Sequence, residues 1–196
     1  AGPIGADTGL DAASAPLAAR GTRRIPVGRG APSRAFGEAR VDFLAGEPRL
    51  REEGPSERGR RNDGSLVLRV DDGRWSVLFA GDVERPGEER LVASGLRLAA
   101  DVVKVPHHGS STSSTAAFVR AAAPRLAVAQ TGLGNRFGFP DRDVVARWRA
   151  AGSGWLDTGR EGSVSVRLCD PRVAAGYQIC TRSFVDPHAR WDTRWW

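Results

Sequence analysis

The amino-acid sequence predicts an α/β domain. Apolar segments with the period of β-strands alternate with segments that have the period and end signals of helices, and this alternation covers most of the chain. Aspartate and histidine follow directly after two of the predicted strands, which is where α/β domains place their functional groups. With 196 residues, the chain is long enough for one domain with a substantial core.

The two ends of the chain lack this alternation. Residues 1–21 are rich in alanine and glycine without a sustained period, so we expect a linker or the remnant of another element. Residues 169–196 are predicted to be a C-terminal tail. The domain is therefore assigned to residues 22–168. Because the chain begins at Ala1 and contains no methionine, we expect it to be part of a longer polypeptide.

The first half of the domain is predicted to consist of strands. Apolar and polar residues alternate within them, and clusters of charged residues and glycine mark their connections. The predicted strands are 24–27, 40–44, 66–70 and 75–80, and the connections include a loop at 47–64 and a hairpin turn at 71–73.

The second half is predicted to alternate helices with strands. One helix opens with Pro86 in its first turn and closes near Gly95, with two glutamates at its positive end. Ser113 or Ser114 is predicted to cap a second helix that runs to Ala123. The remaining elements are the helix 141–151 and the strands 102–105, 126–130, 155–157 and 163–168.

Composition limits the possible classes of protein. The chain has 29 basic and 23 acidic residues, and arginine supplies every basic residue except Lys104. A net charge of +6 suits a phosphate-bearing partner, but the scatter of the arginines favours a compositional bias instead. No window approaches the roughly 20 apolar residues of a membrane helix. Cys169 and Cys180 suit either a disulfide or two free thiols, and their spacing does not match a zinc motif.

The most distinctive segment is 101–110, in which an apolar strand ends in two histidines, a glycine and a serine. Another predicted strand ends just before Asp82. A divalent metal that activates water needs imidazole nitrogens and carboxylate oxygens that converge, with one position left open. We therefore expect Asp82, His107 and His108 to lie together as part of a metal site. Three ligands are too few for a centre of two metals.

Two loops are candidates for binding a substrate at this site. The hydroxyls of residues 110–114 can serve either a phosphate or the cap of the next helix. The glycine-rich loop 132–140 can bring Asn135 and Arg136 over the site, or it can be a tight turn before a helix.

Five segments together resemble one protein family. In order and separation, residues 62–69, 78–84, 101–114, 135–140 and 158–166 are similar to the C-terminal metallo-β-lactamase-like domain of ComEC-type DNA internalisation competence proteins. Each segment is a weak signal alone, but the combination is specific.

The resemblance implies an αββα sandwich, of which this chain holds the C-terminal part. It also implies a zinc or manganese centre and a nuclease that degrades one strand of incoming DNA. Asp82 would bridge two metals, His108 would be a metal ligand, and His107 would face the scissile phosphate, so both histidines are candidate catalytic residues and His107 is a further candidate ligand. Candidate substrate-binding residues are Asn62, Ser65, Ser110, Ser113, Ser114 and Asn135.

The resemblance also implies the surroundings of the domain. The parent polypeptide would be a cell-membrane protein with an upstream channel, and this domain would be a soluble part outside the cytoplasm. DNA would be the partner, and no small organic cofactor is expected.

The sequence departs from the family pattern at two places. The first metal motif of the family, His-x-Asp-x-Asp-His, has no counterpart because no histidine precedes His107, so it would lie upstream of Ala1. Phe139 stands where relatives have a histidine, and a phenyl ring neither binds a metal nor moves a proton. We therefore expect the chain alone to bind metal weakly or not at all and to be inactive.

Three functions remain open from the sequence. The leading hypothesis is a portion of a ComEC-like metal-dependent nuclease domain. The alternatives are a metal-free pseudoenzyme or nucleic-acid-binding module, and a hydrolase of the same fold that acts on another phosphodiester or an ester. A fold alone does not choose among them.

Overall fold

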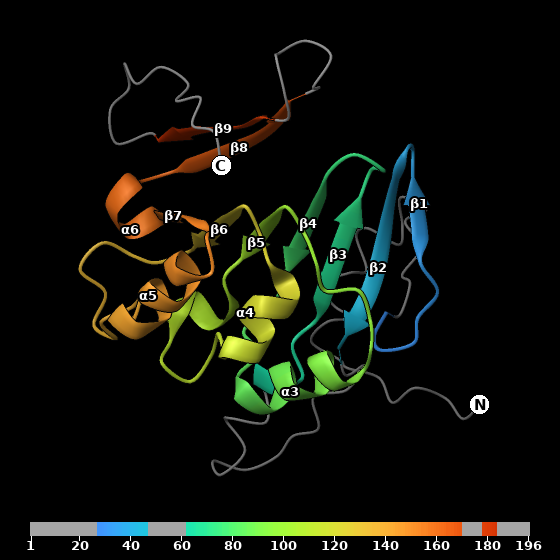
Figure 1. Ribbon diagram of the computed structural model, residues 1–196, viewed down its shortest axis with the longest axis horizontal. Coiled ribbons are helices and arrows are strands. Elements are labelled where there is room, and N and C mark those ends of the chain that lie inside the picture. The colour runs from blue at the N-terminus through green and yellow to red at the C-terminus, as the bar shows by residue number, and fades with distance from the viewer. Residues whose placement is uncertain (1–26, 47–61, 170–177, 184–196) are drawn as a thin grey trace, which may run out of the picture.

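The computed structural model describes residues 27–46, 62–169 and 178–183, and these residues form a mixed α/β fold (Figure 1). The predicted α/β class is therefore confirmed. The predicted linker, almost all of the strand predicted at 24–27 and most of the loop predicted at 47–64 lie outside the described residues. Within the described part of the chain, every helix is too short or too polar to cross a membrane.

A seven-stranded sheet forms the centre of the fold, and its strands lie in the order in which they occur in the sequence. The first four pair antiparallel and the last four pair parallel, so the fourth strand belongs to both parts. Short turns join antiparallel neighbours, whereas parallel neighbours need longer crossovers. The strands are β1 (Arg34–Phe36), β2 (Ala39–Ala45), β3 (Val67–Asp71), β4 (Ser76–Phe79), β5 (Val102–Lys104), β6 (Leu126–Ala129) and β7 (Gly154–Asp157).

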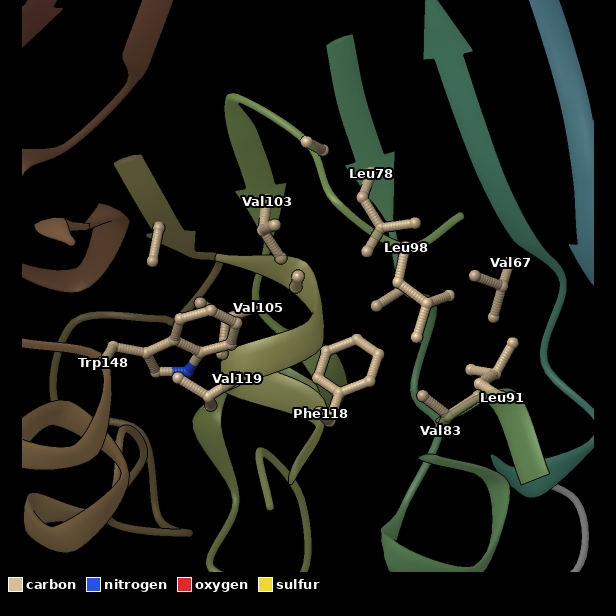
Figure 2. Close-up of a cluster of buried hydrophobic side chains, with 14 of the residues drawn as sticks. Val67, Leu78, Val83, Leu91, Leu98, Val103, Val105, Phe118, Val119 and Trp148 are labelled. Atoms are coloured by element: carbon tan, nitrogen blue, oxygen red, sulfur yellow. The ribbon is translucent and has the colours of Figure 1, made fainter. Parts of the chain in front are cut away.

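The helices that follow β4, β5 and β6 are α3 (Arg85–Ala93), α4 (Ala116–Ala122) and α5 (Arg142–Ala150). Because crossovers between parallel strands share one hand and the strands follow one another in order, these helices cover the same face of the sheet. Phe118 of α4 and Trp148 of α5 meet edge to face in the core, with ring centroids 6.4 Å apart. Figure 2 shows both rings beside the apolar side chains of the sheet.

The other face of the sheet packs against a β-hairpin. Trp75, Val102, Leu126 and Leu156 form a second buried cluster, and β8 (Val164–Cys169) contributes apolar side chains to it. β8 pairs antiparallel with β9 (Gln178–Ser183), and both are drawn above β6 and β7 in Figure 1. The described residues therefore stack in three layers: helices, main sheet and hairpin.

The far end of the chain holds more structure than the sequence pattern indicated. β9 lies within residues 169–196, where only a tail was expected. The short helix α6 (Thr158–Glu161) was also not predicted. In the backbone register of the hairpin, Cys180 lies opposite Arg167 and Cys169 lies opposite Gln178. The two cysteines therefore do not lie opposite each other in this register.

The predicted cap of α4 was wrong. Thr115, rather than Ser113 or Ser114, is the N-cap, and its side chain accepts a hydrogen bond from the N–H of Phe118. The Ser113 hydroxyl instead donates to the carbonyl of Pro106. Ser114 has a positive φ of 59°, whereas an N-cap residue has extended backbone angles.

Candidate active site at the carboxyl ends of the parallel strands

The structure brings two of the predicted ligands together at one edge of the sheet. Asp82 follows β4, and His108 lies in the 3₁₀ turn Pro106–Gly109, which follows β5. β4 and β5 are parallel neighbours, so their carboxyl ends meet at the same edge. The Nε2 atom of His108 lies 3.6 Å from Oδ1 of Asp82.

The backbone separates the two histidines. His107, His108 and Gly109 have consecutive positive φ angles of 45°, 56° and 80°, a conformation that costs free energy for residues with a side chain. Hydrogen bonds hold the turn in place: the N–H of His107 donates to Gly81 O, and the N–H of Asp141 donates to Gly109 O. The two imidazoles therefore point to different partners.

Gln130 sets the tautomer of His108. The Nδ1 atom of His108 lies 2.6 Å from the carbonyl oxygen of Gln130, which follows β6. A carbonyl oxygen only accepts hydrogen bonds, so Nδ1 carries the proton. In the neutral ring, the lone pair then lies on Nε2, the atom that faces Asp82. Histidines that bind metals are held by the same kind of hydrogen bond from the other ring nitrogen.

Lys104 forms an ion pair with Asp82. Its Nζ atom donates to Oδ1 of Asp82 at 3.0 Å and to the carbonyl oxygen of Gly81 at 2.5 Å. Burial by itself would raise the pKa of Asp82, but the hydrogen bond and charge of Lys104, together with the charges of His108 and His107, outweigh it and lower the pKa. Asp82 is therefore an ionised carboxylate at neutral pH.

His107 lies against a different acid. Its Nδ1 atom is 3.2 Å from Oε1 of Glu84 and 3.4 Å from the hydroxyl of Thr112. Asn62 Nδ2 donates to the same oxygen of Glu84 at 2.9 Å and lies 3.5 Å from Nε2 of His107. The ring of Phe139 packs against His107 in a T-shaped contact with a centroid distance of 5.8 Å. His107 is thus enclosed by Glu84, Asn62 and Phe139.

The predicted substrate-binding residues divide into two groups. Asn62 lies at the site through its contacts with Glu84 and His107. The hydroxyl of Ser65 accepts a hydrogen bond from the N–H of Asp82 at 3.1 Å, so it positions that residue. The Ser110 hydroxyl lies 3.0 Å from that of Thr112, which in turn contacts His107.

The other predicted substrate-binding residues are buried or make structural contacts. Ser113 and Ser114 are buried. The side chain of Asn135 donates to the carbonyl oxygens of Gly132 and Phe139 and accepts the N–H of Phe139. It closes its own loop and does not reach over the site. This is the tight turn before a helix, the second of the two alternatives that the sequence left open.

A buried glutamate holds the serine-rich segment in place. Glu88 of α3 is fully buried, and its carboxylate accepts the N–H groups of Ser114 and Thr115. Arg147 of α5 donates to the carbonyl oxygen of Ser114 at 2.6 Å. Burial raises the pKa of Glu88, against the opposing effect of these hydrogen bonds and of the charge on Arg147. The loop after the two histidines is therefore anchored from two helices.

The donor set of the described residues fits a metal ion only in part. Asp82 and His108 direct an oxygen and a nitrogen toward each other. Structural zinc sites have four protein ligands and catalytic sites usually have three. Among the described residues, no group of three or more His, Cys, Asp or Glu side chains could hold a metal ion. The site therefore contains two candidate ligands but not a complete set.

Comparison with known proteins identifies relatives of the chain. No family model matches it. The uncharacterised protein YcaI of Escherichia coli is 32% identical over 145 residues, which are 73% of this chain and 18% of YcaI. Competence protein ComA of Neisseria gonorrhoeae is 40% identical over 117 residues, or 58% of this chain and 17% of ComA. ComE operon protein 3 of Bacillus subtilis is 32% identical over 107 residues, or 55% of this chain and 14% of that protein.

The chain is homologous to the ComEC-type competence proteins. The resemblance drawn from the sequence motifs is thereby confirmed. The chain spans less than a fifth of the length of these relatives.

Two residues of the candidate site were not predicted to have a role. Lys104 binds Asp82, and Glu84 binds His107. Lys104 is the only lysine of the chain and ends a strand, so it carried a weak signal. Its contact with Asp82 follows from the pairing of Phe79 with Lys104 between β4 and β5, which the sequence does not specify.

Proposed function

We propose that this chain forms part of a metal-dependent hydrolase site that cleaves nucleic acid during DNA uptake. The competence proteins among its homologues support the role in DNA uptake. The observation that carries the hydrolase assignment is the pair of Asp82 and His108, with Nε2 at 3.6 Å from the carboxylate and with the tautomer set by Gln130.

The proposed architecture is an αββα metallo-β-lactamase-like sandwich. The three layers of helices, main sheet and hairpin supply its first three layers in part. The remaining strands and helices would come from sequence outside the described residues. A parent polypeptide in the cell membrane, with this domain outside the cytoplasm and with DNA as partner, completes the proposal.

Asp82 and His108 would hold a divalent metal, either zinc or manganese, together with ligands from outside the described residues. Such a metal lowers the pKa of water and offsets the charge on a phosphate. Gln130 keeps the lone pair of His108 toward Asp82, and the low pKa of Asp82 keeps its carboxylate ionised. His107, held by Glu84, would face the phosphate.

Metal binding tests the proposed ligands directly. Titration calorimetry of this chain with Mn²⁺ or Zn²⁺ should give weak binding, because only two ligands are in place, and both Asp82→Asn and His108→Ala should abolish it. Glu38→Gln is the matched control, because it removes an exposed carboxylate in the turn between β1 and β2. Unchanged binding in both site variants would overturn the ligand assignment. Tightly bound metal in a stoichiometric amount, measured by elemental analysis, would contradict the conclusion that the set of metal ligands is incomplete.

Cleavage tests the function. In the parent polypeptide, Asp82→Ala should abolish cleavage of end-labelled DNA while the circular dichroism spectrum stays unchanged. Cleavage of small phosphodiesters or esters but not of DNA would instead support a hydrolase of the same fold with another substrate. Unchanged rates in Asp82→Ala would remove Asp82 from the mechanism.

One observation favours a second candidate, a metal-free nucleic-acid-binding module. Lys104 already supplies a positive charge at Oδ1 of Asp82, the atom that also faces His108. In such a module, the ion pair would stand permanently where the first proposal needs a metal. Binding of DNA by the parent polypeptide without any metal dependence or cleavage would support this candidate over the hydrolase.

A further inference from the structure

The loop between β6 and α5 contacts His107 through Phe139 and exposes two other apolar side chains. Leu133 is 91% exposed and Phe137 is 62% exposed, although large apolar side chains are usually buried. In Figure 1, this loop leads into α5 on the side of the molecule where α6 lies. Because the fold does not bury these side chains, they are available to a partner.

The aromatic rings of the loop form an ordered stack. Phe137 lies on Phe139 with a centroid distance of 5.5 Å and an interplanar angle of 19°. The guanidinium carbon of Arg136 lies 4.9 Å from the centroid of Phe137. Phe139 also contacts His107 at 5.8 Å. Flat groups thus extend from the candidate active site to the solvent. We call Arg136, Phe137 and Phe139 the aromatic platform.

Asn135 holds the aromatic platform in its conformation. Its side chain forms one hydrogen bond with Gly132 and two with Phe139. The backbone adds a bond from the N–H of Gly138 to the carbonyl oxygen of Asn135. A loop closed by such bonds loses less conformational entropy when it binds a ligand.

A hollow of about 670 Å³ adjoins the aromatic platform at Phe139, the member of the platform that lines it, and is bounded by the loop and by the starts of α5 and α6. Arg142 and Arg160 line it and are exposed. Three aspartates also line it: Asp143 is exposed, Asp141 accepts backbone N–H groups of α5, and Asp157 accepts the N–H of Gly159 and the hydroxyl of Thr131. Arg142 and Arg160 are the cations of this lining that can meet phosphates.

We propose that the aromatic platform stacks an unpaired base of single-stranded DNA, with Arg142 and Arg160 near the adjacent phosphates. Aromatic rings with neighbouring arginines are the features by which proteins bind single strands without reading sequence. In a duplex, the base faces are already covered by neighbouring bases, so only an unpaired base offers a free face. Because the platform adjoins His107, the proposal deepens the proposed function. It rests on that function for the assignment of the bound polymer as nucleic acid.

Fluorescence anisotropy with a labelled oligothymidine tests the platform in a buffer with chelator. Phe137→Ala should weaken binding about tenfold or more, and Phe137→Trp should restore it. Phe36→Ala is the matched control, because Phe36 is 64% exposed on β1 and should leave binding unchanged. A duplex should bind more weakly and respond little to Phe137→Ala.

Two results would overturn the proposal: equal affinities of wild type and Phe137→Ala, or full binding by Phe137→Leu, which keeps an apolar surface without a ring and would show that stacking is not required. Asp82→Asn separates the two proposals. If the platform binds single strands, Asp82→Asn should not cause the loss of affinity expected for Phe137→Ala, even where it removes metal binding. If the Phe137 variants bind single strands as the wild type does and metal binding is intact, the platform is refuted while the proposed function stands.

Discussion

Lys104 Nζ lies 3.0 Å from Oδ1 of Asp82, so the only lysine of the chain is bound to the carboxylate of the candidate active site. Lys104 ends β5, and Asp82 follows β4, the parallel neighbour of β5. Lys104 is 14% exposed and Asp82 is 41% exposed. The pair is therefore partly open to solvent. Its main effect is on the pKa of Asp82 rather than on the stability of the fold.

Lys104→Met should raise the pKa of Asp82, because it removes the hydrogen bond and the charge that lower it. The free energy of unfolding should change by no more than about 1 kcal/mol. A lowered pKa contributes stability above the unfolded-state value, and this contribution is lost as pH falls through the folded-state value. In Lys104→Met, the folded-state pKa moves up towards the unfolded-state value, so this contribution to stability should shrink. Carboxyl ¹³C NMR titration measures the shift, and Arg97→Met, at an exposed cation near Asp71, should leave Asp82 unchanged.

Glu88→Gln should change how stability depends on pH. Burial raises the pKa of Glu88, so the folded state holds this proton more tightly than the unfolded state does. As pH rises from the unfolded-state pKa through the folded-state pKa, the wild type should lose stability relative to Glu88→Gln, whose side chain does not titrate. Urea unfolding at a series of pH values measures the difference. A difference in the free energy of unfolding that stays constant with pH would contradict the raised pKa of Glu88.

Gly81→Ala should destabilise the protein more than Gly95→Ala. Both glycines have positive φ, 57° and 69°, so both substitutions share a backbone cost of about 1–2 kcal/mol. A Cβ at Gly81 would come within 2.7 Å of Ser65 Cβ, whereas nothing lies within 4 Å at Gly95. The clash should add about 1–3 kcal/mol and displace the Ser65 hydroxyl from the N–H of Asp82. Thermal unfolding compares the two variants, and equal costs would count against the steric effect.

His108→Val should destabilise the protein more than His108→Asn. The φ of His108 is 56°, which asparagine tolerates and a β-branched residue does not. Both variants remove the imidazole, so the contrast isolates the backbone conformation, with an expected difference of about 1–2 kcal/mol. Denaturant unfolding monitored by tryptophan fluorescence measures it. If the valine variant were as stable as the asparagine variant, the turn would not require the left-handed conformation.

Much of the local structure could be predicted from the sequence. The periods of Leu66, Leu68 and Val70 and of the apolar residues from Val102 to Val105 indicated strands, which the structure has at β3 and β5. The helices α3 and α5 begin and end within two residues of their predicted bounds. Periodicity and end signals are properties of neighbouring residues, so a sequence displays them directly.

Elements with a weak local signal were missed. β1 has three residues and α6 has four, which is too short for a period to appear. β9 lies in a part of the sequence where no alternation was recognised, and it is defined by pairing with β8. Its existence depends on a distant partner rather than on its own residues.

The sequence by itself determined the α/β class, most of the strands and helices, and the kinds of residues that follow the strands. Only the tertiary structure decided that Lys104 binds Asp82, that Glu84 binds His107, and that the two adjacent histidines face different acids. These contacts depend on which strands pair, in which register, and on positive φ angles at His107 and His108. Residues 22 positions apart, such as Asp82 and Lys104, meet through the order of the sheet, which local residue patterns do not encode.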